Sequence, residues 1–134
     1  MAADTGKIFA CKGCVIGSAV DGVTHGKILY KPAAKRDMLT KASVVGRADV
    51  GVEIYGNNPR ALTLKLGTLG ASVVFSVLRD DGTTGTETLA LVDLVEVVGS
   101  AEIPEADSGG KLAAFGIRGW CQGTGDLDDK WQSA

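Results

Sequence analysis

The chain has 134 residues, of which 45% are hydrophobic and 22% are charged, and its formal net charge is −2. These values fit one globular domain, exclude a chain that is disordered over most of its length, and lack the basic excess that is typical of nucleic-acid-binding proteins. The apolar runs are too short to span a membrane and the first residues lack the features of a signal peptide, so we expect no membrane partner, synthesis in the cytoplasm and reduced cysteines.

The first third of the chain is predicted to contain an arm, a hairpin and a long loop. Residues 1–13 are polar with one short apolar piece, and we interpret them as an N-terminal arm or a weak edge strand. Short apolar runs on both sides of Asp21-Gly22 predict a hairpin at this turn signal. Residues 31–47 have no stable hydrophobic period, which indicates a long loop of the kind that is often functional.

Residues 48–56 alternate strictly between apolar side chains and polar or small ones. One face of this segment carries Val50, Val52 and Ile54, and the other carries Asp49, Gly51, Glu53 and Tyr55. Strict alternation over this length predicts a half-buried β-strand, with the valines and the isoleucine facing the core.

A short helix is predicted directly after this strand. Asn58 can cap free backbone N–H groups, and Pro59 suits the first helical position. Leu62 and Leu66 follow at i, i+4 spacing, and Gly67 or Gly70 can end the helix after about two turns. A short strand is the competing interpretation, because the leucines of this segment also alternate with polar residues.

The second half of the chain reads as strands and connections. The expected order is a strand at 72–78, a hairpin tip at 79–86, a strand at 88–98, a connection at 99–110 and a last strand at 112–121. The first two of these strands are rich in Val and Leu and predict central strands of a packed sheet. Residues 123–134 form a polar, acidic tail that stays mobile unless Trp131 docks it.

These elements define a mainly β fold class. We predict an antiparallel β-sandwich or partial barrel with one short flanking α-helix and a long loop. The corresponding division of the chain is an N-terminal arm at 1–13, a β-sandwich domain at 14–122 and a polar C-terminal tail at 123–134.

One chemical motif stands out, the pair Cys11 and Cys14 at C-x-x-C spacing. This spacing suits a redox dithiol or half of a zinc site, for which Cys121 and His25 are the further soft ligands of the sequence. A redox motif is expected to open a helix beside a βαβ unit, and none follows here. We therefore favour plain reduced thiols and expect no metal, while a zinc site or a redox or disulfide role stays open.

No constellation of residues predicts an active site. His25 is the single histidine and has no recognisable nucleophile motif beside it. The glycines at 67–70 and 82–85 lack the lysine and hydroxyl residues of a phosphate loop, so turns explain them. We expect a structural protein rather than an enzyme, with no catalytic residues and no cofactor.

The element order resembles that of a known family. The matching parts are an early hairpin at 19–24, the loop at 31–47, the strand at 49–55, the helix near 59–66, a hairpin at 73–89 and a closing strand at 112–118. In this order the chain resembles the tail tube proteins of long-tailed bacteriophages and, more distantly, the tube proteins of contractile secretion systems. The resemblance spans residues 14–121 and is one of element order.

The resemblance implies a virion protein of the phage tail, made in the host cytoplasm, whose hexameric rings stack into a hollow tube through which DNA passes. Its partners would be further copies of itself, other virion proteins and, transiently, DNA. The loop expected to grip the next ring carries Lys31, Lys35, Arg36, Asp37, Met38 and Lys41. The lumen candidates are Asp49 and Glu53. A capsid decoration protein is the alternative, and a Cys/His zinc-binding module is a further one.

Overall fold

A computed structural model describes residues 7–36, 43–101, 103, 105–106, 115–125 and 127–134, of which 33–36, 43–47 and 127–128 are described by their backbone only. The elements are β1 Ile8–Ile16, β2 Ser18–Val20, β3 Val23–Arg36, β4 Ser43–Gly56, α1 Pro59–Thr63, β5 Thr68–Arg79, β6 Thr84–Val98, β7 Phe115–Cys121, α2 Leu127–Lys130 and β8 Trp131–Ser133. Within these ranges no helix is long and apolar enough to cross a membrane.

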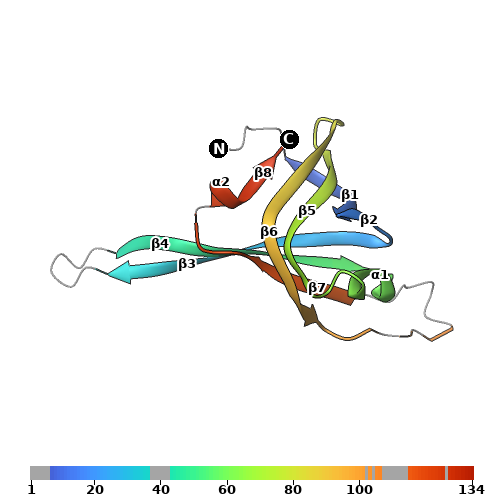
Figure 1. The fold of residues 1–134 in the computed structure, drawn as a ribbon. Helices are drawn as coiled ribbons and strands as arrows, with labels where there is room; N and C mark the ends of the chain where they lie inside the picture. The colour runs from blue at the N-terminus through green and yellow to red at the C-terminus, as the bar shows by residue number, and fades with distance from the viewer. Residues whose placement is uncertain (1–6, 37–42, 102, 104, 107–114, 126) are drawn as a thin grey trace.

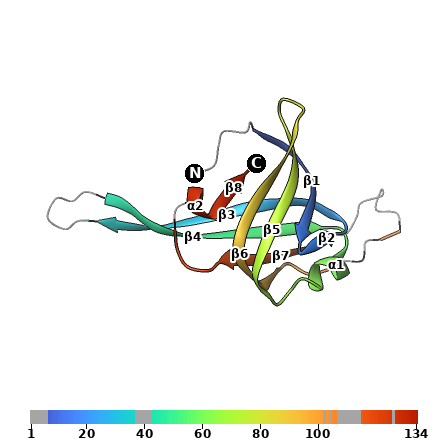
Figure 2. The same ribbon diagram turned by 45° about the horizontal axis from the view of Figure 1, so that its top comes forward.

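The eight strands form one antiparallel sheet that bends into two layers (Figures 1 and 2). The strand order is β2-β1-β5-β6-β7-β4-β3, and β8 pairs with β6. The long strand β6 joins the layers, because its first part pairs with β5 and its last part with β7. In both views β5 and the first part of β6 cross β3 and β4 steeply, as in orthogonal sheet packing. The predicted mainly β, sandwich-like class is confirmed, and the sheet is not closed into a barrel.

The core lies between these layers and is built from alternating strand residues. Val50, Val52 and Ile54 are fully buried, which confirms the face predicted for this strand. They belong to one cluster with Val73 and Leu89 of the crossing layer. Burying side chains of this size stabilises the fold by about 1.5–3 kcal/mol each relative to exposure.

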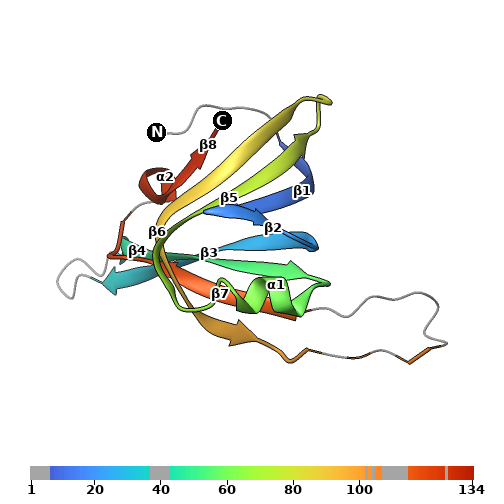
Figure 3. The ribbon, with the colours of Figure 1, turned by 45° about the vertical axis from the view of Figure 1, so that its right-hand side comes forward.

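The helix α1 begins as predicted. The side chain of Asn58 accepts a hydrogen bond from the Ala61 N–H at 3.3 Å, and Pro59 occupies the first turn. Leu62 is fully buried, and α1 lies beside β7 at one end of the sandwich (Figure 3). The competing strand is therefore wrong, although α1 ends at Thr63, before the predicted Leu66.

The predicted loop at 31–47 is wrong over most of its length. β3 and β4 continue to pair through this region, ending with Lys35 opposite Val44 and Arg36 opposite Ser43. Only residues 37–42 at the tip lie outside the described part of the chain. The paired ends of β3 and β4 before this tip extend away from the other labelled elements (Figure 1). Pairing along this part of the hairpin depends on the register of its backbone and not on an apolar period, so the sequence lacked the usual strand signal.

The hairpin predicted around Asp21-Gly22 is also wrong. A turn is present there, and Gly22 has a φ of 80°, which favours glycine. The strands on either side do not pair with each other, because β2 pairs with β1 and β3 pairs with β4. The turn instead joins the two ends of the strand order, which leaves the barrel open.

At both predicted boundaries of the β-sandwich domain, the flanking segment belongs to the same sheet as the domain. The boundary at residue 13 falls inside β1, which pairs with β5 from Ile8 to Ile16. The tail folds back as α2 and β8, and β8 pairs with β6. The indole Nε1 of Trp131 donates a hydrogen bond to Glu87, so Trp131 docks the tail.

Candidate functional site

The crossing layer of β3, β4, β7 and the end of β6 presents one outward face that is polar. We call it the polar sheet face, and it comprises His25, Lys27 and Lys31 of β3, Asp49, Glu53 and Tyr55 of β4, Asp93 and Glu96 of β6, and Arg118 and Trp120 of β7. The strand register places Lys27 opposite Glu53, Glu53 opposite Arg118, and Arg118 opposite Glu96. Charges therefore alternate in sign along one row across four strands.

Arg118 is the centre of this row. Its Nη1 lies 3.2 Å from a carboxylate oxygen of Glu53, and its Nε lies 2.5 Å from one of Glu96. The hydrogen bond to Glu96 raises the pKa of Arg118 further above its ordinary value. The hydroxyl of Tyr55 donates to the other oxygen of Glu53, which raises the pKa of Tyr55. Glu53 is buried beneath these partners, whereas Asp49 is exposed.

Two aromatic rings lie flat on this face over glycines of neighbouring strands. A Cβ built on Gly51 would lie 2.6 Å from the ring of Trp120, and one built on Gly116 would lie 2.7 Å from the ring of Tyr55. Because these glycines have no side chain, the rings can pack against the backbone of the sheet. The result is a flat surface between the charged rows.

The rings also hold the basic side chains of β3. The Nζ of Lys31 lies 5.0 Å from the ring centroid of Trp120, and that of Lys27 lies 5.6 Å from the centroid of Tyr55. His25 stacks on Tyr55 at 4.8 Å between centroids. Together with the pairs of Arg118, these contacts engage each Lys and Arg side chain of the face. The face also carries four carboxylates, of Asp49, Glu53, Asp93 and Glu96, against three cations, so it has no excess positive charge and little net attraction for phosphate.

The β3–β4 hairpin carries unpaired backbone edges. Among the described strands none pairs with the free edge of β3, and β4 pairs with β7 only from Gly51 to Gly56. Further out, an isolated bridge joins Ala48 to Gly125, and beyond it no described strand pairs with the outer edge of β4. The projecting part of the hairpin thus exposes two backbone edges that can still form hydrogen bonds.

The residues predicted to grip a neighbouring ring are distributed over this hairpin. Lys31 is exposed on the polar sheet face, and Lys35 and Arg36 belong to the last paired part of β3. Asp37, Met38 and Lys41 lie outside the described residues. The lumen candidates Asp49 and Glu53 both lie on the polar sheet face.

The zinc alternative loses its ligand set. Cys14 and Cys121 are buried, Cys11 is partly buried, and His25 lies on the polar sheet face. In the described ranges, which include all four, no three His, Cys, Asp or Glu side chains gather into a group that could hold a metal ion. Burial raises the pKa of Cys14 to about 12 and also raises that of Cys121, so both thiols stay protonated at neutral pH.

Sequence reasoning missed most of the polar sheet face. No functional role was predicted for Arg118, Trp120 or Glu96, because nothing local in the sequence distinguishes them from other exposed strand residues. Their roles depend on the register between strands that are far apart in the chain. The glycines Gly51 and Gly116 were the available signal, since a glycine inside a strand often marks close approach of another group.

No known protein family matches the sequence, and no curated protein matches it either. The resemblance to phage tube proteins is therefore an inference from the order of elements. The function is argued below from the geometry of the β3–β4 hairpin and the polar sheet face.

Proposed function

We propose that this protein is a structural subunit of a bacteriophage tail tube, which assembles into stacked, hexameric rings around a channel for DNA. The observation that carries the proposal is the projecting β3–β4 hairpin with its two unpaired edges. β3 alone has 14 residues, or about 46 Å of strand, which is long for an edge strand left open to solvent.

The hairpin suits a repeating, head-to-tail contact. One of its free edges belongs to β3 and the other to residues 43–47 of β4. These edges differ, so the β3 edge of one copy pairs with the β4 edge of the next, which is a heterologous interface that closes into a ring. Pro32 and the lysines on β3 limit uncontrolled pairing, because proline removes one donor and like charges repel identical edges.

The polar sheet face supports the same proposal as the lining of the channel. It carries the outward side chains of β3 and β4, so hairpins joined edge to edge turn this face toward a common axis. Its three basic side chains are outnumbered by the carboxylates of Asp49, Glu53, Asp93 and Glu96. DNA would pass such a wall without being held, because few counterions are released on contact.

Electron microscopy of concentrated protein tests this function. Rings or tubes with a central hole are expected for the natural chain. Replacing residues 34–45 with Asn-Gly removes the projecting part of the hairpin and reconnects it by a two-residue turn. This variant should keep the circular dichroism spectrum of the sheet and sediment as a monomer. Replacing residues 80–82 at the β5–β6 tip with Asn-Gly, which keeps Arg79 opposite Thr83, is the matched control and should leave assembly intact.

Two outcomes would contradict the proposal. Assembly that persists without residues 34–45 would show that the hairpin edges are not the contact. Trimers or monomers that bind empty capsids, with no ring at any concentration, would instead support the capsid decoration alternative.

A further inference from the structure

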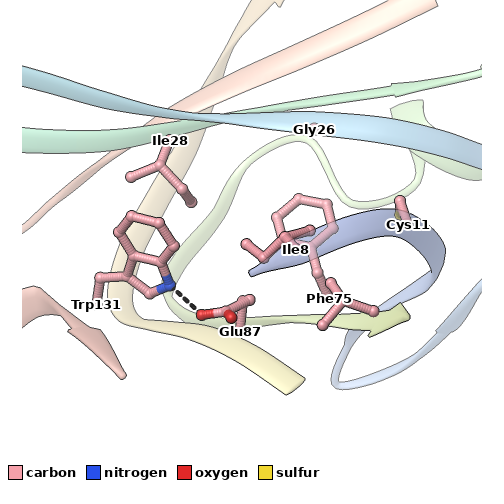
Figure 4. Close-up of a pocket in the computed structure, with 8 residues that line it drawn as sticks. Ile8, Cys11, Gly26, Ile28, Phe75, Glu87 and Trp131 are labelled. Atoms are coloured by element: carbon pink, nitrogen blue, oxygen red, sulfur yellow. Dashed lines mark hydrogen bonds between the residues drawn. The ribbon is translucent and has the colours of Figure 1, made fainter. Parts of the chain in front are cut away.

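A cavity of about 340 Å³ lies between the two layers, away from the polar sheet face (Figure 4). Its wall is formed by Ile8 and Cys11 of β1, Gly26 and Ile28 of β3, Phe75 and Val77 of β5, Glu87 of β6 and Trp131 of β8. The cavity exists because the sheet is open at this point, where β1 and β3 approach each other without pairing. β8 bounds it through Trp131.

Most of this wall is apolar. Figure 4 shows the rings of Trp131 and Phe75 on different sides of the space, with Ile28 above Trp131 and Ile8 on the side of Phe75. Gly26 is required where β3 crosses Phe75, because a Cβ there would lie 2.4 Å from the phenyl ring. The rings and aliphatic side chains leave space that has a hydrophobic lining and stays open to solvent at Ile8, which is 48% exposed.

The acidic group in the wall is already compensated. One oxygen of Glu87 accepts from Arg79 Nη1 at 2.6 Å, and the other accepts from Trp131 Nε1 and from the Ser133 hydroxyl. The Arg79–Glu87 pair is neutral as a unit, so the cavity offers no net charge to a ligand. It therefore favours a neutral molecule over a cation or an anion.

We propose that this cavity is a binding site for a small, neutral, two-ring aromatic molecule. Ligand sites are commonly apolar, partly aromatic pockets of 300 Å³ or more with a few fixed polar groups, and this cavity has that composition. An apolar cavity of about 150 Å³ accommodates a single benzene ring, so twice that volume suits two fused rings. The site does not depend on the proposed tube function, because it lies at Gly26 and Ile28 of β3, whereas the proposed assembly contact uses the projecting end of the β3–β4 hairpin.

Cys11 gives a direct measure of occupancy. Its thiol lines the cavity and is partly exposed, whereas Cys14 and Cys121 are buried in the core. A disulfide reagent such as DTNB should therefore react quickly with one thiol of the folded chain and slowly with the other two. A molecule seated in the cavity shields Cys11 from the reagent.

The experiment measures the rate of this fast reaction at pH 8 with and without indole, a neutral two-ring probe. At ten times the dissociation constant of indole, the rate should fall about tenfold, since only the empty cavity reacts. Calorimetric titration should give one site per chain. Ile28→Phe fills the cavity and should abolish the heat of indole binding, while Val15→Phe, on the opposite face of β1, should leave it unchanged.

The proposal has defined ways to fail. A reaction rate that indole does not alter, or indole binding that survives Ile28→Phe in a folded variant, would overturn it. If Ile28→Phe does not fold, Val77→Leu is the second variant, because it adds only one methylene group to the same cavity wall. A rate that falls with protein concentration in the absence of indole would assign the cavity to a second copy of the chain and would also overturn the proposal.

Discussion

The two layers of the sandwich each contain an arginine held by glutamate, and the two clusters differ in burial. Between the layers, Arg79 and Glu87 are 2% and 3% exposed in their side chains. On the polar sheet face, Arg118 is 34% and Glu96 is 41% exposed. The same pair of chemical groups therefore contributes in two ways. The buried pair fixes the docking of β8, while the exposed row sets the electrostatic character of a surface.

This difference follows from solvation. A buried ion pair is strongly coupled, because removal of one partner leaves a charge that water cannot reach. An exposed pair is screened and contributes little to stability. The comparison predicts that changes at Arg79 will affect folding, and that changes at Glu96 will affect binding with little effect on folding.

The largest effect is expected for Arg79→Met. This change leaves the carboxylate of Glu87 buried with only Trp131 and Ser133 as donors, and removal of one partner of a buried pair costs about 3–5 kcal/mol. The free energy of unfolding, measured by urea denaturation, should fall by this amount. The double variant Arg79→Met with Glu87→Leu should recover part of the loss. A single variant as stable as the natural chain would contradict the assigned coupling.

The next largest effect is expected at alkaline pH, where the stability of the fold should respond to buried groups more than to exposed ones. Burial raises the pKa of Cys14 to about 12 from 9.0, so the folded chain keeps a proton that the unfolded chain releases. Stability from this group is complete below pH 9 and falls as the pH rises toward 12, by about 1 kcal/mol per pH unit. Cys14→Ala should reduce this slope in urea denaturation between pH 9 and 11, leaving the part that is due to Cys121, whose pKa burial also raises.

Tyr55 provides the matched measurement on the polar sheet face. Its hydrogen bond to Glu53 raises its pKa above 10.0, so its contribution to stability is present below pH 10 and is lost above it. Tyr55→Phe should leave the slope between pH 9 and 10 unchanged, because the buried thiols of Cys14 and Cys121 cause that part. A slope that disappears in Tyr55→Phe and persists in Cys14→Ala would reverse the assignment.

The smallest effect on stability is expected for Glu96→Gln. The Glu96–Arg118 pair is exposed, and exposed pairs contribute about 0–1 kcal/mol. The same change removes one negative charge from the polar sheet face, so binding of the unassembled protein to duplex DNA at low salt should increase. Asp81→Asn at the β5–β6 tip changes the net charge equally, away from this face, and serves as the control. Equal gains in both variants would show that the face has no special role.

The local elements of the fold could be predicted wherever a segment had one buried face. The alternation of Val50, Val52 and Ile54 predicted β4, and Asn58 with Pro59 predicted the start of α1. These signals come from burial and from capping, which act within a few residues of the chain. The same reasoning gave the sandwich-like class and the two central strands β5 and β6.

Pairing partners, in contrast, were decided by the tertiary structure. The sequence contains the turn at Asp21-Gly22, but nothing local indicates that β2 and β3 belong to opposite ends of the strand order. Residues 31–47 have no hydrophobic period in the sequence. Only the hydrogen bonds between β3 and β4 show that they form a hairpin. The row of Lys27, Glu53, Arg118 and Glu96, and the cavity at Trp131, arise in the same way. The sequence by itself determined which segments bury a face. The choice of neighbour for each strand depends on contacts between distant residues, and those contacts built both candidate sites.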